Sequence, residues 1–428
     1  MNRVLLVGLL IFALLAVGLA ALDGRFLLLL IPLLIYVGAA LLRMPEEIAV
    51  RAYRDVHPLA AQEGERITVG LQLVNTGSET ALLEVHDALP ERLRVLAGET
   101  EQLVALPAGA ATHLEYVVEA PRGSYEFQSV LVAVSETLGL FRRTARLPAY
   151  GGFSVMPRAP RLRSLEIRPR RTLGFAGPIP SRQSGVGVDF FGVREYQPGD
   201  PLRRVNWRAM ARRPERPYTT EFEQERTADV GLILDVRRQC VFEMEGISLL
   251  EYGVQATAAL AESLLHDGHR VGLLLYGRGI EWVFPGYGRV QREHILRALA
   301  NAGPGDSQVF ASLDFFPARL FPPRSQLIFI SPLQSDDLGM LFRLRAHGYA
   351  VLVVSPDPVA FEVAHLPADP LLPMAIRLAQ LERRLLLQQL RQGGIAVADW
   401  QVQRSLDESL HATVARAVRG GPWVGRAP

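Results

Sequence analysis

The first part of the chain is dominated by two apolar stretches. No charged or strongly polar side chain occurs in residues 4–22 or in residues 26–42, and each stretch has about the length that spans a bilayer as a helix. Only residues 23–25 separate them, which is enough for a turn but too short for a domain. The pattern therefore predicts a hairpin of two transmembrane helices within residues 1–45.

Basic residues near these stretches predict their orientation. The outer flanks carry four arginines: Arg3, Arg43, Arg51 and Arg54. The turn carries Arg25 beside Asp23, so the positive-inside rule places both chain ends on the cytoplasmic side of a bacterial plasma membrane. The soluble domains are then expected in the cytoplasm. A signal peptide cleaved near residues 19–21 is the alternative, but a second apolar stretch follows at once.

Residues 47–157 change to an alternation of apolar and polar side chains with a period of two. The run ITVGLQLVN meets turn residues at 75–77, a second alternating run follows, and LEYVVEA and SVLVAVSETLGLF come later. The pattern predicts an immunoglobulin-like β-sandwich of about 100 residues. Its histidines, His57, His86 and His113, are scattered, and we expect them to be exposed strand and turn residues without a catalytic role.

Residues 229–428 alternate between apolar strand patterns and helical patterns. Strands are predicted at 230–236, 270–277, 326–331, 349–355 and 395–400, and helices at 248–266, 289–302, 338–346, 374–391 and 405–418. Such alternation predicts a doubly wound α/β domain with an open sheet. The helix at 374–391 is expected to pack on this sheet through Ile376, Leu378, Leu381, Leu385 and Leu387, with a coiled-coil contact to a partner as the alternative.

Composition and motifs exclude several classes of function. The formal net charge is +2, and the single cysteine, Cys240, lies in no metal-ligand or redox spacing. The sequence contains no GxxxxGK[ST], HExxH or GxSxG motif and no paired carboxylates at a plausible site. We therefore expect no enzyme activity, no cofactor and no small-molecule substrate.

A basic linker and a distinctive motif occupy residues 158–228. The linker is broken by prolines and carries seven arginines: Arg158, Arg161, Arg163, Arg168, Arg170, Arg171 and Arg182. It could bind anionic lipid headgroups near the anchor, where each basic residue contributes about 1 kcal/mol, or be a solvated linker. Both interpretations stay open.

The motif lies in GVDFFGVREYQPGDPLRRVNWRAMARRPERPYTTEFEQER, residues 187–226. Its distinctive positions are Phe191, Arg194, Tyr196, Gly199, Asp200, Arg203, Arg204, Trp207 and Arg208, followed by residues 211–212 and 221–223. This region resembles the signature of the bacterial family called domain of unknown function 58. The order of the predicted parts, from hairpin to α/β domain, is also similar to that family. The resemblance implies a von Willebrand factor A-like domain and an association with MoxR-type AAA+ ATPases.

Two interpretations of the motif remain from its chemistry. Residues 198–201 predict a tight turn, and arginines beside Trp207 and Tyr196 can stack as well as bind carboxylates or phosphates, which favours a docking surface. Alternatively the motif is a structural brace, with Arg194 or Arg203 bound to nearby carboxylates. Those carboxylates are Glu195, Asp200 and the acidic strand at 221–225.

The A-like domain that the resemblance implies holds a divalent metal on an Asp-x-Ser-x-Ser loop in other proteins. Here the loop reads Asp235-Val236-Arg237-Arg238-Gln239, and Pro332 stands where a later aspartate is expected. The degenerate site therefore comprises Asp235, Arg237, Gln239 and, as a remnant hydroxyl, Ser307. Since Mg²⁺ needs several oxygen ligands and a guanidinium repels it, we expect no metal and instead an ion pair between Arg237 and Asp235.

These observations predict a membrane-anchored adaptor or scaffold. The resemblance implies that its A-like domain works with a MoxR-type AAA+ ATPase in the assembly or maturation of other protein complexes. The alternative is an anionic-lipid or nucleic-acid binding protein that uses residues 158–226, with a steep salt dependence. Since aromatic residues are sparse there and no nucleic-acid-binding module is recognisable, no nucleic-acid partner is expected.

Overall fold

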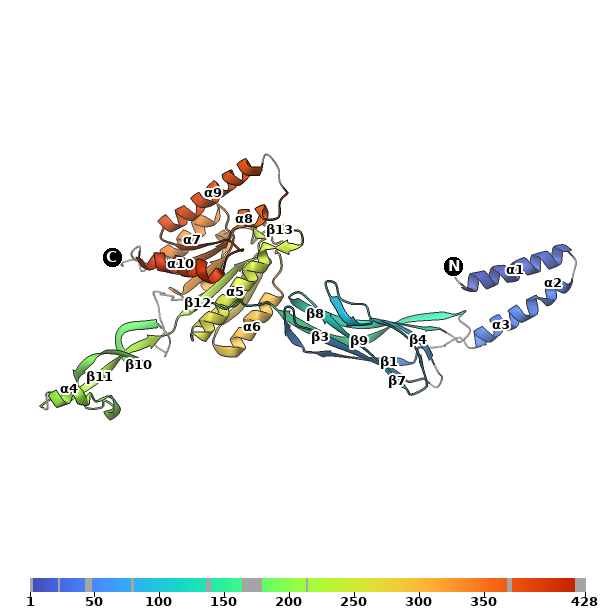
Figure 1. Cartoon of the computed structure of the whole chain (residues 1–428), viewed down its shortest axis with the longest axis horizontal. Helices are drawn as coiled ribbons and strands as arrows, with labels where there is room; N and C mark the ends of the chain where they lie inside the picture. Colours follow the sequence, from blue (N-terminus) through green and yellow to red (C-terminus); the bar gives the residue numbers. More distant parts are fainter. Residues whose placement is uncertain are drawn as a thin grey trace. The chain divides into compact units, whose positions relative to one another are not determined.

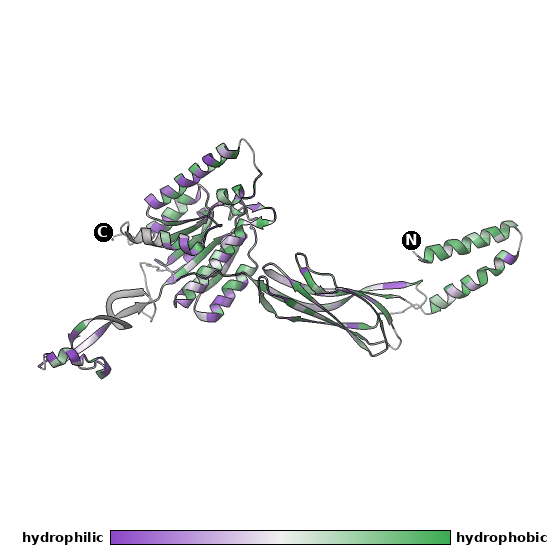
Figure 2. Ribbon diagram, viewed as in Figure 1, coloured by the Kyte–Doolittle hydropathy of each residue, from purple (hydrophilic) through white to green (hydrophobic). Residues whose placement is uncertain are grey.

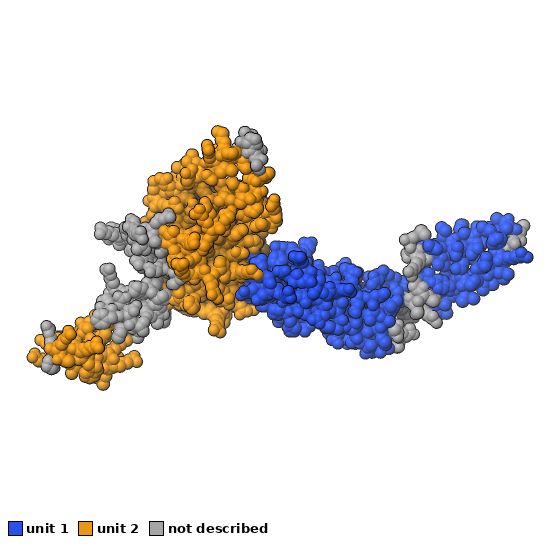
Figure 3. Space-filling view, in the orientation of Figure 1, with its two compact units in different colours: residues 1–156 blue, residues 157–428 orange. Residues whose placement is uncertain are grey.

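The computed structural model describes residues 3–21, 24–42, 48–77, 81–135, 140–163, 179–212, 215–367 and 372–419. The chain divides into two compact units, residues 1–156 and residues 157–428 (Figure 3). Each unit contains a hydrophobic core of its own.

The N-terminal helices are α1 (Arg3–Ala21), α2 (Gly24–Leu28) and α3 (Leu30–Leu42). Their residues are mostly hydrophobic (Figure 2), and most of their described side chains are exposed. Val4–Ala21 and Gly24–Leu42 are long and apolar enough to cross a membrane, so they would fit a membrane anchor. The predicted turn was too long, because Gly24 and Arg25 are helical. Asp23 and Arg43, which entered the prediction, lie outside the described residues.

The remainder of unit 1 forms two β-sheets that share one core. The strands are β1 (Val50–His57), β2 (Ala60–Gln62), β3 (Ile67–Asn75), β4 (Ala81–His86), β5 (Arg94–Gly98), β6 (Glu101–Leu106), β7 (Ala111–Glu119), β8 (Gly123–Ser135) and β9 (Arg142–Met156). One sheet has the order β1-β3-β7-β5 and the other β2-β9-β8-β4-β6. Buried residues of both sheets, such as Leu71 and Val132, belong to one hydrophobic cluster. Burying one face of each sheet explains the period of two in the sequence.

The turn predicted at residues 75–77 does not join two paired strands. β3 pairs with β1 and β7, whereas β4 pairs with β6 and β8 in the other sheet. The chain therefore passes from one sheet to the other at this point. Asn75 is buried and donates a hydrogen bond from Nδ2 to the carbonyl oxygen of Leu106 at 2.9 Å.

A buried polar cluster connects the two sheets of unit 1. The Arg54 guanidinium lies in an ion pair with Asp87 and 4.3 Å from the centre of the Phe127 ring. The Tyr116 hydroxyl donates to the same carboxylate at 2.7 Å. Because Arg54 is buried in this cluster, it is not an exposed juxtamembrane charge in the folded protein.

The three histidines of this region are exposed, as predicted. Each nevertheless lies near a carboxylate. His86 and Glu101, on paired strands, approach to 2.7 Å, and His57 and Asp55 to 3.0 Å. These partners were not predicted from the sequence; they are solvent-exposed contacts of small energetic value.

Unit 2 contains a six-stranded sheet with the order β16-β15-β12-β17-β18-β19. The strands are β12 (Asp229–Asp235), β15 (Arg270–Tyr276), β16 (Ile280–Gly286), β17 (Gln326–Ile330), β18 (Ala350–Pro356) and β19 (Ala396–Trp400). All neighbours are parallel except β15 and β16. The predicted alternation of strands and helices in a C-terminal α/β region is confirmed, while the antiparallel edge strand β16 was missed.

Helices lie on both faces of this sheet (Figure 1). They are α5 (Leu249–His266), α6 (Gly288–Ala300), α7 (Asp337–Ala346), α8 (Pro358–Val363), α9 (Leu372–Gln392) and α10 (Leu406–Arg419). Ile233 and Phe329 of the sheet pack with Leu341 of α7 and Leu387 of α9 in one core. On the opposite face, Gly253 of α5 lies close to Leu234. A Cβ atom at Gly253 would lie only 3.2 Å from Cδ1 of Leu234. Short elements complete the unit: η2 (Arg238–Cys240), β13 (Glu243–Met244), β14 (Ile247–Ser248), η3 (Leu313–Phe315) and η4 (Ala318–Leu320).

Helix α9 corrects part of the predicted packing. Leu387 is buried as expected, together with Leu390 and Arg383. In contrast, Leu378, Leu381 and Leu385 are exposed. The sequence pattern therefore contained two apolar faces, of which only one packs on the domain.

The distinctive motif lies in a separate two-stranded antiparallel sheet of unit 2. This sheet pairs β10 (Ile179–Glu195) with β11 (Tyr218–Arg226). Between the strands lie the 3-10 helix η1 (Leu202–Arg204) and the short helix α4 (Trp207–Arg212). The side chain of Phe191 is outside the described part of the chain.

Candidate functional site

The first site is a carboxylate clamp at the end of the β10–β11 hairpin. The Arg194 guanidinium binds both oxygens of Asp200, with Nη1–Oδ2 and Nη2–Oδ1 distances of 2.7 and 2.8 Å. Its Nε donates to Glu221 on the neighbouring strand at 2.7 Å. Arginine suits this arrangement because its planar fork binds carboxylates in a bidentate manner. We call Arg194, Asp200 and Glu221 the brace.

The brace closes a tight turn in the chain. The Asp200 carboxylate accepts a hydrogen bond from the backbone N–H of Gln197 at 2.9 Å, and the Asp200 N–H donates to the Gln197 carbonyl at 3.0 Å. Gly199, between them, has φ +111°, a conformation that favours glycine. The Tyr196 hydroxyl donates to the Asp200 carbonyl at 3.3 Å. The structure thus has the predicted tight turn, placed one residue earlier than predicted at residues 197–200, and four motif residues hold it.

Charge complementarity shifts the pKa values of the brace. Hydrogen bonding to Asp200, and then to Glu221, raises the pKa of the Arg194 guanidinium. Hydrogen bonds from Arg194, and then from the Gln197 N–H, hold the pKa of Asp200 below its ordinary value. Both groups are therefore charged at neutral pH.

Beyond the brace, the chain is fixed to β11 by its backbone. The Asn206 N–H donates to the Tyr218 carbonyl at 2.8 Å, and Val205 forms a bridge with Thr219. The Asn206 side chain then accepts from the Ala209 N–H at 3.0 Å, in the manner of a helix N-cap, and α4 begins at Trp207. This break separates η1 from α4.

Four other side chains of the motif region are exposed. Leu202 is 73% exposed and Trp207 is 64% exposed. Arg203 and Arg208 are also exposed. We call these four residues the apex. Arg204 is half-buried and belongs to neither group.

The two interpretations of the motif thus apply to different residues. Arg194 makes the predicted internal ion pairs with Asp200 and with Glu221 of the acidic strand, whereas Arg203 makes none with the side chains that the structure describes. Glu195 pairs with Arg216 instead, at 2.5 Å. The geometry is that of a stiffened hairpin end with an exposed tryptophan.

The second site is an arginine held between two aspartates at the carboxyl ends of the parallel strands. Arg237 binds Asp235 through Nε and Nη2, at 2.9 and 2.8 Å. It binds Asp337 through Nη1 and Nη2, at 2.9 and 2.7 Å. All three side chains are at most 2% exposed. We call Asp235, Arg237 and Asp337 the crevice cluster.

The crevice cluster lies where the strand order reverses, between β12 and β17. This is the usual ligand position in open α/β sheets. The Ser331 hydroxyl, directly after β17, donates to Asp235 at 2.6 Å, and the Gln334 N–H donates to Asp337 at 2.8 Å. The carboxylates therefore have few lone pairs left for a ligand.

The charges of this cluster follow from burial and pairing. Burial acts to lower the pKa of the Arg237 guanidinium, but the hydrogen bonds and charge of Asp235, and then the hydrogen bonds of Asp337, raise it above its ordinary value. Burial raises the pKa of Asp337, partly offset by Arg237. Burial also raises the pKa of the nearby Cys240 thiol, which remains protonated and unreactive.

The predicted ion pair between Arg237 and Asp235 is confirmed, but two neighbours were assigned wrongly. The hydroxyl next to Asp235 is Ser331, whereas Ser307 makes no hydrogen bond to the cluster. The second carboxylate is Asp337 at the start of α7, although no such aspartate was expected after β17. Gln239 is exposed and donates to the Ala311 carbonyl at 2.8 Å. These residues do not fit a divalent metal, because the guanidinium occupies both carboxylates.

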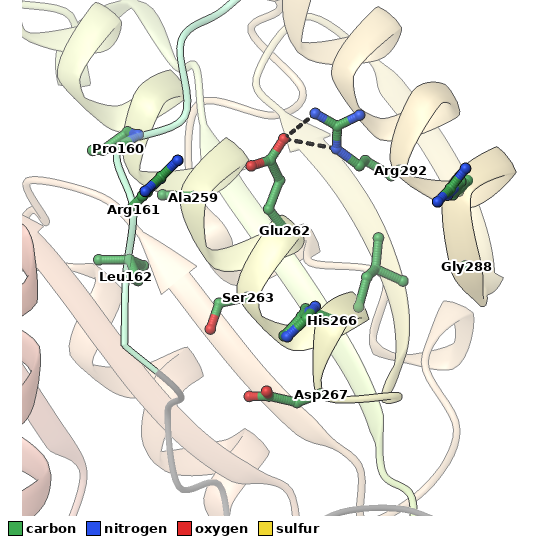
Figure 4. A pocket seen from close by; sticks show the side chains of 12 residues that line it. Pro160, Arg161, Leu162, Ala259, Glu262, Ser263, His266, Asp267, Gly288 and Arg292 are labelled. Atoms are coloured by element: carbon green, nitrogen blue, oxygen red, sulfur yellow. Dashed lines mark hydrogen bonds and ion pairs between the residues drawn. The ribbon is translucent and has the colours of Figure 1, made fainter.

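The linker leads to a cavity of about 740 Å³ (Figure 4). Pro160, Arg161 and Leu162 line one side, and the end of α5 and the start of α6 line the other. Its charges are mixed: Glu262 pairs with Arg292 at 2.5 Å, and Asp267 lies on the same wall. This cavity is not a purely basic site.

The linker arginines include one with an internal contact and three that the structure does not describe. Arg163 forms an ion pair with Asp407 at 3.2 Å, and its backbone N–H donates to the same carboxylate at 2.9 Å. Arg168, Arg170 and Arg171, on which the lipid interpretation mainly depends, lie outside the described residues. Of the described linker, at least Arg163 is committed to an internal contact.

Comparisons with known proteins agree with the motif. The family model "Protein of unknown function DUF58" matches residues 192–366, which include most of the hairpin motif and the crevice cluster. "Uncharacterized protein YeaD" of Bacillus subtilis is 28% identical over 281 residues, covering 64% of this chain and 67% of that protein. "Uncharacterized protein Rv1480" of Mycobacterium tuberculosis is 28% identical over 146 residues, covering 32% of this chain and 44% of that protein. The chain thus spans less than half of the mycobacterial relative.

Among solved structures, the cupredoxin domain of amoB from Nitrosocaldus yellowstonii matches 26% of this chain and 89% of that domain. The TM-score is 0.19 and the sequence identity 9%, so this likeness assigns neither fold nor function.

The chain combines two apolar N-terminal helices, several β-sheets and a C-terminal α/β region that carries the braced hairpin. The DUF58 family model matches the signature region and much of the α/β region, so the resemblance to this family drawn from the sequence is confirmed.

Proposed function

We propose that this protein is a membrane-anchored adaptor that uses the apex to dock a protein partner. The partner is a MoxR-type AAA+ ATPase, and the pair acts in the assembly or maturation of other protein complexes. The observation that carries the proposal is the division of the motif. The brace holds the hairpin end in one shape, while Leu202 and Trp207 remain exposed beside two arginines.

Exposed tryptophan and arginine side chains are enriched at interface hot spots. Leaving the large apolar side chain of Trp207 exposed to water is unfavourable. The short helix α4 does not need this side chain for its own stability. A fixed hairpin also loses little conformational entropy on binding, which increases affinity. The apex therefore suits a protein partner better than a role confined to internal packing.

The finer architecture belongs to the same proposal. The helices at 3–42 form a multi-pass anchor with both termini and the soluble units in the cytoplasm, supported by Arg3 and the exposed Arg51. The two sheets of unit 1 form an immunoglobulin-like spacer. Unit 2 contains a von Willebrand factor A-like domain; its strands, numbered in chain order, run 3-2-1-4-5-6, a doubly wound order. The crevice cluster replaces the metal of such domains with an internal ion pair, so the domain needs no cofactor and no enzyme activity is assigned.

The proposal is tested by crosslinking and affinity capture of the full-length protein from its native membrane. The wild type is compared with a Trp207→Ala, Arg208→Ala double variant. The expected result is that the wild type captures an AAA+ ATPase and the double variant captures at least roughly tenfold less, because truncating a hot-spot tryptophan commonly costs 2 kcal/mol or more, on the order of a thirtyfold loss.

A matched control is Tyr150→Ala, which removes another strongly exposed aromatic side chain, on β9. This variant should capture as much ATPase as the wild type. Equal capture by all three proteins would remove the apex from the interface. Capture of no ATPase by the wild type would remove the partner from the proposal.

A further inference from the structure

Helix α9 has two opposite faces with different surroundings. Arg383, Leu387 and Leu390 are buried against the domain. Arg383 fixes this face, because it donates to Asp399 at 2.8 Å and to the Ser355 carbonyl at 3.0 Å. The opposite face carries four exposed apolar side chains: Met374 (81% exposed), Leu378 (59%), Leu381 (48%) and Leu385 (51%). We call these four residues the outer stripe.

The outer stripe has the spacing of a coiled-coil seam. Its members follow one another at intervals of four, three and four residues, which is the alternation of a and d positions in a heptad repeat. Met374 and Leu381 take d positions, and Leu378 and Leu385 take a positions. The stripe is about 16 Å long at 1.5 Å per residue. Figure 1 shows α9 at the surface of unit 2, where a second helix could lie along it.

The charges beside the stripe are arranged for one particular neighbour. In this heptad, Arg377 and Arg384 take g positions and Glu382 takes an e position. All three are exposed, and in the described part of the chain neither Arg377 nor Glu382 forms an ion pair. In a parallel helix pair, a g residue faces the e residue five positions later on the other helix, so Arg377 of one copy would face Glu382 of the other.

We propose that the outer stripe is the self-association surface of this protein, occupied by α9 of a second copy in parallel orientation. Two Arg377–Glu382 ion pairs flank the seam, one on each side. In an antiparallel pair, g positions would face each other and bring arginines together, which is unfavourable. This inference is independent of the ATPase partner, because the stripe and the apex lie on different elements.

Confinement of both copies in a membrane makes a short coiled-coil seam sufficient for self-association. Two heptads give modest affinity in solution, but anchoring both copies in one bilayer raises their effective concentration. The buried contacts of Arg383 keep the stripe directed outward, so each copy presents a preformed surface.

Disulfide crosslinking of the full-length protein in its membrane tests the orientation. In a parallel pair, Met374 lies beside its counterpart, within the Cα separation of about 4.4–6.8 Å that a disulfide requires. In an antiparallel pair it would lie about 16 Å from its counterpart and beside Leu385. Met374→Cys should therefore form a covalent dimer on mild oxidation. Gln380→Cys, exposed on the same helix but off the stripe, should not, and the buried Cys240 of the parent chain gives the background.

Charge reversal tests the register. Arg377→Glu or Glu382→Arg alone should weaken self-association roughly tenfold, since each dimer gains two repulsive pairs. The double variant should regain it, and a mixture of the two single variants should form heterodimers, because opposite charges again face each other. Self-association is measured by fluorescence energy transfer between labelled copies in vesicles.

Several results would overturn the inference. One is a Met374→Cys protein that crosslinks no more than Gln380→Cys. Another is a crosslink that appears only between Met374→Cys and Leu385→Cys chains, which would assign an antiparallel pair. If Met374→Cys stays monomeric but vesicle lipid protects its thiol from a soluble maleimide, the stripe faces the bilayer and not a second copy.

Discussion

Two arginines of this protein each bind two carboxylates, but one arginine is partly exposed and the other is buried. Arg194 of the hairpin binds Asp200 and Glu221, and Arg237 of the α/β domain binds Asp235 and Asp337. The side chain of Arg194 is 36% exposed, whereas that of Arg237 is 1% exposed. Each guanidinium joins two carboxylates, but only one does so away from water.

The different surroundings determine what each ion pair can do. An exposed pair is screened and contributes little to overall stability, so the brace acts locally by fixing a turn and presenting the apex. A buried pair becomes very unfavourable when one partner is removed, because an unpaired charge is left in the core. The crevice cluster is therefore a structural element of the core of unit 2, whereas the brace supports a surface that remains exposed.

Removing the buried arginine should have the largest effect. Arg237→Met leaves two buried carboxylates facing each other, and we expect it to destabilise unit 2 by about 3–5 kcal/mol. Hydrogen exchange of the β12 and β17 amides measures this loss. The exposed neighbour Arg238→Met is the control and should change stability by less than about 0.5 kcal/mol. Equal protection in both variants would contradict the role assigned to Arg237.

A smaller change should turn the cluster into a cation site. Arg237→Ser frees the carboxylates of Asp235 and Asp337 and adds a hydroxyl beside Ser331, giving oxygen ligands of the kind that Mg²⁺ prefers. We expect Mg²⁺ to stabilise this variant, by about 2.7 kcal/mol at one hundred times its dissociation constant. The wild type should show no Mg²⁺-dependent shift in thermal unfolding. A shift of equal size in the wild type would show that the guanidinium does not exclude the cation.

Weakening the exposed arginine should have only a local effect. Arg194→Lys keeps the charge but loses the bidentate geometry with Asp200. We expect faster hydrogen exchange at the turn amides of Gln197 and Asp200, with unchanged protection in the six-stranded sheet. Arg203→Lys, an equivalent change at the exposed apex, should leave the turn amides as protected as in the wild type. Loss of protection throughout unit 2 in Arg194→Lys would mean that the brace is a global structural element.

Acid should separate the two clusters with the smallest perturbation. The lowered pKa of Asp200 means that its stabilising contact is present above the ordinary aspartate pKa of about 3.9 and is lost as the pH falls through the lower, folded-state value. The raised pKa of Asp337 has the opposite sign, since the folded protein takes up that proton more readily than the unfolded chain. We therefore expect Asp337 to protonate first without loosening β17, and the turn at Asp200 to lose protection at lower pH. Carboxyl titration by NMR checks the order.

The sequence predicted the elements whose signal is periodic. The apolar runs at β12, β17 and β18 and the alternation in β3 follow directly from burial on two faces or on one face. The antiparallel strand β16 was missed because its pattern is short and contains Pro285. The exposed leucines of α9 were assigned to the core because periodicity alone cannot tell which of two apolar faces packs on the domain.

The contacts within the brace and the crevice cluster depend on how the chain folds back on itself, which the sequence pattern does not specify. Arg194 and Asp200 are six residues apart and were correctly paired as one option, because a turn between them was recognisable. Asp337 lies 100 residues from Arg237 and reaches it only through the order of the parallel strands. Only the position directly after β17 was considered for the later aspartate. Considering the whole loop up to the start of α7 would have included Asp337 among the predicted ligands. The division of the motif into brace and apex required the exposures of individual side chains.

The most direct test of the account is photocrosslinking from the apex in the native membrane. A photoreactive phenylalanine analogue replaces Trp207 in the full-length protein, and the same analogue at Tyr150 is the control. The account predicts a crosslink from position 207 to an AAA+ ATPase, lost when Arg194→Ala removes the brace, and none from position 150. A crosslink from position 207 only to this chain itself, with the hairpin otherwise folded, would contradict the docking role of the apex.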